Sequence, residues 1–134
     1  MIDFENVILT TVRTNLLQEF PKVEVTSTFE RNPSHFPTVS VVEADNTTDP
    51  RTVDSGSKEN RVRVMYEVQV WTNNAAGKKQ QGKKIFKSVS DTLVSLGLYR
   101  TMSRPFRGVD DDAVYRHIGR FTGFISTDGK VYGR

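Results

Sequence analysis

The stretch that decides the fold is RVRVMYEVQVWT, residues 61–72, in which two kinds of side chain alternate. One parity is apolar and holds Val62, Val64, Tyr66, Val68 and Val70. The other is mixed and holds Arg61, Arg63, Met65, Glu67, Gln69 and Trp71. Because side chains of like parity lie on the same face of a strand, the stretch predicts a long strand with one face in the core. Another chain is expected to cover part of its mixed face.

Two helices are predicted on either side of this strand. The first spans 3–19, with Asp3 as N-cap and Pro21 just beyond its end. Its apolar residues recur at steps of three and four and are Phe4, Val7, Ile8, Val12 and Leu16. A second apolar stripe of Ile85, Phe86, Val89, Leu93 and Leu96 ends at Gly97, in the position of a helix stop.

Further strands are predicted at 22–28, 38–44 and 114–126, with a hairpin turn at 127–130 and a short tail at 131–132. Gly119 and Gly123 within the last long strand indicate bulges or close backbone approach. Loops are predicted at 29–37, 45–60 and 103–112. This order predicts an α+β fold with one mainly antiparallel or mixed sheet and two helices on one face. We expect a single domain over 1–134 with a long flexible loop at about 45–60.

Composition excludes several classes of protein. The 134 residues hold 19 Lys and Arg against 16 Asp and Glu, a formal net charge of +3, with no Cys and two His. There is no disulfide framework, no cysteine nucleophile and little for a histidine metal site, so we expect no cofactor and no metal. No apolar run is long enough to span a membrane, and the acidic N-terminus lacks the basic start of a signal peptide. A soluble cytoplasmic domain is expected, and +3 is too small to imply nucleic-acid binding.

Three candidates for metal or acid–base chemistry have simpler interpretations. The run of Asp110, Asp111 and Asp112 offers oxygen ligands, but consecutive side chains on an extended chain diverge, which favours a solvated loop. His117 has no nucleophile or carboxylate near it in sequence and is interpreted as a packed or interface histidine. His35, between prolines in a loop, carries less information.

The strongest local charge is a lysine cluster with no acidic residue between 78 and 87: Lys78, Lys79, Lys83, Lys84 and Lys87. It lacks the Ser or Thr of a phosphate loop. It could meet phosphate or an acidic partner, but the solvated face of a helix is the favoured interpretation. Its separation from the acidic loop and the aspartates at 110–112 suits subunits that meet head to tail.

Several apolar side chains fall on mixed faces or in loops, where a monomer gains little from them: Phe29, Phe36, Met65, Trp71, Phe106 and Tyr132. They are typical of an oligomer contact, but they could also simply cap the ends of the sheet, and the sequence favours neither interpretation.

The order and character of four segments carry a family resemblance: the helix at 3–19, the strand at 61–72, the lysine-rich helix GKKIFKSVSDTL at 82–93 and the strand VYRHIGRFTGF at 114–124. Together they resemble the tail-completion or tail-terminator (head-to-tail joining) proteins of long-tailed, non-contractile bacteriophages, over nearly all of the chain.

The resemblance implies a mixed α/β fold and a homo-oligomeric ring, typically a hexamer, without an active site. Such a ring caps the tail tube, stops its polymerisation and joins the tail to the head connector. Its partners are other copies of itself, the tail tube protein and the head connector protein. DNA passes through the lumen non-specifically, and no membrane is involved. The location is the tail or neck of the virion, assembled in the host cytoplasm.

For subunit or tube contact we expect Arg61, Arg63, Met65 and Trp71, with Arg51 and Lys58 on an arm that orders on assembly. The alternatives are another small head–tail connector or neck protein, and a nucleic-acid-binding module that uses the lysine cluster. An enzyme is disfavoured because the sequence offers no convergent nucleophile, base or metal set.

Overall fold

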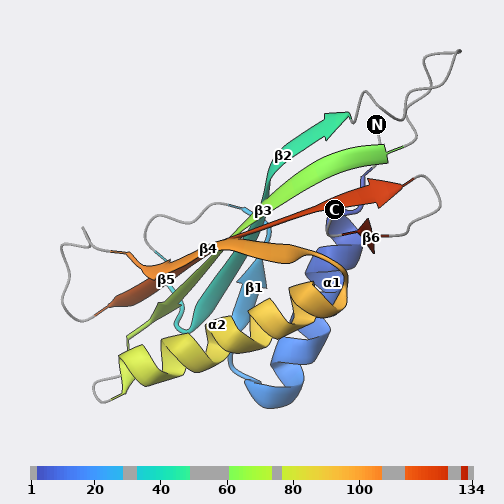
Figure 1. The fold of residues 1–134 in the computed structure, drawn as a ribbon. Coiled ribbons are helices and arrows are strands. Elements are labelled where there is room, and N and C mark those ends of the chain that lie inside the picture. The colour runs from blue at the N-terminus through green and yellow to red at the C-terminus, as the bar shows by residue number, and fades with distance from the viewer. Residues whose placement is uncertain are drawn as a thin grey trace, which may run out of the picture.

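The computed structural model describes residues 3–28, 33–48, 61–73, 77–106, 114–126 and 131–132. Within these residues there are two helices, α1 (Glu5–Glu19) and α2 (Lys78–Ser95), and one sheet. The strands are β1 (Glu24–Thr26), β2 (Thr38–Thr48), β3 (Arg61–Thr72), β4 (Tyr99–Pro105), β5 (Tyr115–Ser126) and β6 (Val131–Tyr132). The predicted α+β class is confirmed, and both helices lie on one side of the sheet (Figure 1).

Strand β3, the long strand that the alternation predicts, forms the centre of the sheet. The strand order is β1-β2-β3-β5-β4, with β6 paired to β5. Among the described strands, only the β1–β2 pair is parallel, and the remaining pairs are antiparallel. β3 pairs with β5 along its whole length, from Arg61 opposite Ser126 to Thr72 opposite Tyr115. The sheet is therefore mixed and mainly antiparallel.

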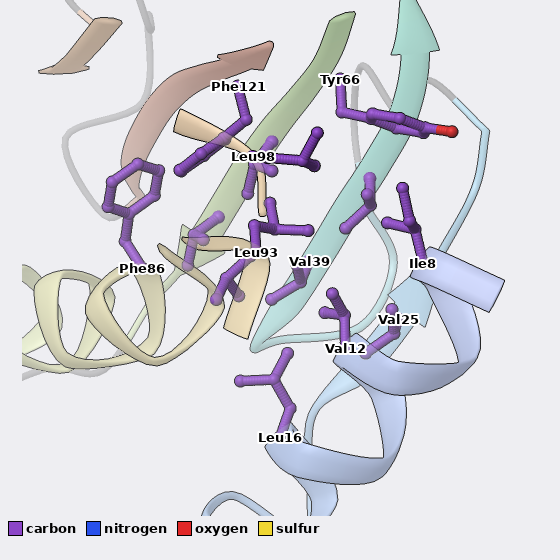
Figure 2. Packing of buried hydrophobic residues seen from close by; sticks show 14 of the residues in the cluster. Ile8, Val12, Leu16, Val25, Val39, Tyr66, Phe86, Leu93, Leu98 and Phe121 are labelled. Atoms are coloured by element: carbon purple, nitrogen blue, oxygen red, sulfur yellow. The ribbon is translucent and has the colours of Figure 1, made fainter. Parts of the chain in front are cut away.

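The core lies between the sheet and the helices (Figure 2). The apolar parity of β3 is fully buried there, so the predicted inner face is confirmed. Helix α1 contributes Ile8, Val12 and Leu16, which are buried. Val7 belongs to the predicted apolar stripe but is 45% exposed, so its prediction as a core residue is wrong. The inner side of α2 is likewise buried, through Ile85, Phe86, Val89 and Leu93.

The helix ends differ slightly from the predicted bounds. Phe4, not Asp3, is the N-cap of α1, although an oxygen of the Asp3 carboxylate accepts a hydrogen bond from the Glu5 amide at 3.1 Å. At the C-terminal end of α2, Gly97 has a φ of +106°, a conformation that glycine adopts without strain, and the predicted helix stop is confirmed.

Two predicted loops are partly strand. β2 continues to Thr48 beyond a bulge between Glu43 and Asp45, so the loop prediction is wrong for residues 45–48. Residues 103–105, also predicted as loop, belong to β4. Both segments are polar and largely exposed, and their backbones form strand because the neighbouring strand satisfies their hydrogen bonds. The remainder of the predicted loop, 49–60, lies outside the described residues.

Gly119 confirms the predicted close approach. A Cβ atom at this position would lie 2.2 Å from the Phe86 ring, which crosses the strand there. Because only a glycine leaves room for the ring, this residue fixes how closely α2 packs on β5. Within the described part of the chain, no helix is long and apolar enough to cross a membrane.

Candidate interaction surfaces

The mixed parity of β3 lies on the face of the sheet opposite the two described helices, and we call this the open face. The strand register places on it the predicted contact residues Arg61, Arg63, Met65 and Trp71. Register also adds every second residue of β5, from Arg116 to Ser126, and Tyr99 of β4, which shares a row with Met65 through Thr122. The four residues predicted for subunit or tube contact therefore do share one face.

Trp71 is nevertheless buried within the chain, because it is only 2% exposed. The Arg116 guanidinium lies 5.3 Å from the centre of the Trp71 ring and 4.1 Å from that of Phe106. Arg116 also donates through Nε and Nη2 to Oε1 of Gln69, with an Nε–Oε1 distance of 2.9 Å. Of the two interpretations of Trp71, an oligomer contact or packing within the sheet, the burial favours packing, since cross-strand neighbours cover the ring. Its part in a subunit contact stays a prediction.

The opposite end of the open face is more accessible. The Arg61 guanidinium stacks on the Phe124 ring at 4.2 Å. Arg63 is exposed and Met65 is half-buried. Tyr99, in the row of Met65, is 42% exposed. Arginine, methionine and aromatic side chains are the types enriched at protein–protein contacts, so this end has the composition of an interface.

The lysine cluster lies on α2, away from the open face. Lys79, Lys83, Lys84 and Lys87 are exposed and Lys78 is half-buried, as the solvated-face interpretation expects. Lys87 pairs with Asp91 at 3.1 Å. The described strands contain arginines and no lysine, whereas α2 contains lysines and no arginine. The two kinds of cation are thus segregated between the sheet and the helix.

Three carboxylates meet where α1 begins, a cluster that the sequence does not indicate. Asp3, Glu5 and Glu43 each offer one oxygen, and these oxygens lie within 4.8 Å of one another. Burial, followed by the charges of Glu43 and Asp3, raises the pKa of Glu5. Carboxylate oxygens are suitable ligands for hard cations, but exposed acidic groups also commonly lie close together where no cation is bound. Glu43 comes from β2, which is why sequence spacing could not reveal the cluster.

His117 is buried on the helix side of β5, and its interpretation as a packed histidine is confirmed. Its Nδ1 lies 2.8 Å from the Tyr115 hydroxyl and its Nε2 lies 2.9 Å from that of Ser103. Burial, then the charges of Lys83 and Arg100, lowers the pKa of His117. The sequence did not indicate the pairing with Ser103, because that residue falls in a predicted loop.

The other candidates add little. His35 is exposed, and its Nε2 lies 2.8 Å from the carbonyl oxygen of Lys22. Phe36 is half-buried and Phe106 is exposed. The predicted arm residues Arg51 and Lys58, the aspartates at 110–112 and Phe29 lie outside the described residues, as does the side chain of Tyr132.

Comparison with known proteins yields a likeness of fold. No protein-family description matches the sequence, and no curated protein matches it significantly. Among solved structures, the chain is similar to a chain in the structure described as the virion of a native gene transfer agent (GTA) particle. The TM-score is 0.52 at 19% sequence identity, and the match covers 95% of this chain and 85% of the other. The chain therefore shares its fold with a component of that particle.

Proposed function

We propose that the protein is a non-enzymatic structural component of a phage-like virion, where it caps the tail tube and joins it to the head connector as a ring. The observation that carries the virion assignment is the shared fold with a chain of the gene transfer agent particle, over 95% of this chain. The tail-capping role rests on the resemblance in segment order to tail-completion proteins.

The proposed mechanism is geometric and needs no bond-making step. Subunits of a closed ring meet through two different patches, because a head-to-tail contact is heterologous. We assign the accessible end of the open face, around Arg63, Met65 and Tyr99, to one patch. The second patch is assigned to the arm that carries Arg51 and Lys58. Tube growth stops when the ring covers the end to which the next tube subunit would add.

The choice of the open face over the lysine cluster follows from the segregation of cations. Arginine is weakly hydrated and presents planar donors, so it is favoured in contacts that exclude water, whereas lysine is strongly hydrated. The open face holds arginines beside aromatic rings, and α2 holds exposed lysines. The open face is therefore the better candidate for a dry contact between subunits.

A charge-reversal pair tests this assignment. Arg63→Glu and Lys84→Glu each change the net charge by the same amount, at an exposed position of a strand and of a helix respectively. Light scattering after size exclusion should show a ring-sized species for the unaltered chain and for Lys84→Glu, and a shift to monomer for Arg63→Glu. If assembly occurs only on tubes, the same comparison is made by co-sedimentation with tubes. Equal assembly of both variants would contradict the assignment.

A further inference from the structure

A cleft lies between α2 and β4, on the helix side of the sheet and away from the open face. Its volume is about 460 Å³. Lys83, Lys87 and Asp91 line it from α2, and Arg100, Ser103 and Arg104 line it from β4, with His117 of β5 behind Ser103. The side chains of Lys83, Lys87 and Arg100 thus surround one carboxylate, that of Asp91, which pairs with Lys87. The cleft carries a clear excess of positive charge.

We propose that this cleft binds an oxyanion of the phosphate class, held by Lys83, Arg100 and the hydroxyl of Ser103. This inference is independent of tail capping, because it uses neither the open face nor an assembled ring. Charge-assisted hydrogen bonds from ammonium and guanidinium groups are among the strongest that a phosphate oxygen receives. Cations from two separate elements allow the group to be contacted from both sides.

The hydrogen-bond chain behind the cleft determines whether Ser103 can donate to the ligand. A neutral histidine has one nitrogen that donates and one that accepts. When the proton is on Nε2 of His117, the Tyr115 hydroxyl donates to Nδ1, and Nε2 donates to the Ser103 oxygen. The Ser103 proton is then free to point into the cleft. With the proton on Nδ1, Ser103 must instead donate to Nε2. A bound oxyanion therefore selects the Nε2–H tautomer.

Ser103 and His117 also have the spacing of a nucleophile and its general base. Activation of a serine requires a histidine that readily accepts a proton, and such a base is commonly oriented by a carboxylate. Here Nδ1 of His117 is bound to the Tyr115 hydroxyl, and burial with Lys83 and Arg100 disfavours the protonated ring. These features suit binding of an anion better than proton abstraction.

The pKa of His117 should report binding, because that pKa depends on the charged groups that line the cleft. Lys83, Lys87 and Asp91 of α2 and Arg100 and Arg104 of β4 are the charges around it, and Tyr115 is its titratable neighbour on β5. A bound phosphate offsets the cations that hold the His117 pKa down, so that pKa should rise on binding. The ring nitrogens also report the tautomer directly.

The test is an NMR titration of the full-length chain with inorganic phosphate, against chloride at equal ionic strength. We expect saturable shifts at Ser103 and Arg100, a move of His117 to the Nε2–H tautomer and a rise in its pKa. Lys83→Gln should weaken binding about tenfold, through loss of a charge-assisted hydrogen bond. The matched variant Lys84→Gln removes the same charge from α2 outside the cleft and should stay within about twofold.

A second arm, with a short DNA duplex as probe, separates the two sources of phosphate. Competition between the duplex and inorganic phosphate at Ser103 assigns the site to phosphodiesters, and binding of inorganic phosphate alone assigns it to the free ion. Both outcomes support the proposal. Shifts that do not saturate, or equal losses for Lys83→Gln and Lys84→Gln, would overturn it, because they indicate only diffuse attraction by the lysine cluster. Duplex binding without change at Ser103 or His117 would also overturn it.

Discussion

The Tyr66 hydroxyl donates a hydrogen bond to Oε1 of Glu43, its direct cross-strand partner, at 3.3 Å. This contact holds the Glu43 carboxylate on the helix side of the sheet, beside Asp3 and Glu5 at the start of α1. Tyr66 is fully buried, so the bond joins the core to a cluster of like charges. The sheet and the first helix therefore meet at a point of electrostatic repulsion.

Glu43→Gln should stabilise the fold at neutral pH. Glutamine keeps an oxygen that accepts from Tyr66 but removes one of the three charges, and the expected gain is about 0.5–1 kcal/mol. The pKa of Glu5 is raised in the folded state, so its ionisation costs stability as the pH rises through that pKa. The gain should therefore vanish near pH 3. Urea unfolding at both pH values measures it, and Glu24→Gln, an exposed carboxylate outside the cluster, is the control.

Stability should fall as the pH is lowered from about 7 to 5, because of His117. Its pKa is lowered in the folded state, so the unfolded chain binds the proton first and gains stability relative to the fold. His117→Gln should flatten this part of the pH profile, whereas His35→Gln, at an exposed ring, should leave most of the slope. An unchanged slope in His117→Gln would refute the assignment.

Gly119→Ala should destabilise the fold by about 1–3 kcal/mol, the usual cost of overpacking. The added Cβ would meet the Phe86 ring at 2.2 Å. Phe86→Leu is destabilising by itself, but Gly119→Ala should cost less in that background because the ring is gone. A double-mutant cycle by denaturant unfolding measures this coupling, and additive effects would show that the clash is relieved elsewhere.

Arg116→Lys should cost more stability than Arg120→Lys, although both arginines lie on the open face of β5. Arg116 donates twice to Gln69 and lies over two aromatic rings, contacts that a lysine cannot reproduce together. The expected loss is about 1–2 kcal/mol. Arg120 pairs with Glu67 at 3.3 Å on an accessible part of the face, and its loss should stay below about 0.5 kcal/mol. Thermal unfolding of the two variants compares them.

The central strand and both helices could be predicted from sequence because their apolar periodicity is strong. The alternation at 61–72 shows which side chains of the strand share a face. The apolar side chains lie on the buried face, and the mixed set lies on the open face. β4 could not be predicted in this way. Its side chains are almost all exposed, so its strand conformation comes from pairing with β5 and not from burial.

The contacts that make up the candidate sites could not be predicted either, because they depend on the tertiary structure. Ser103 and His117, or Glu43 and Glu5, are brought together by sheet register and helix packing, and no local pattern marks them. Trp71 illustrates the same limit. Its place on the mixed face left an oligomer contact and packing within the sheet equally open, and the structure shows that Arg116 from the adjacent strand covers the ring. A mixed face is thus a weak guide to exposure when long side chains cross from one strand to the next.

Tail-capping is tested most directly by electron microscopy of tubes grown from the tail tube protein of the same particle, with and without this chain. We expect tubes of limited length with a ring at one end when the chain is present, and tubes that continue to grow when it is absent. Tubes should continue to grow when the Arg63→Glu variant is added, and they should stay limited in length when the Lys84→Glu variant is added. Tube lengths that do not change on addition of the unaltered chain, with no density at either end, would contradict the tail-capping function.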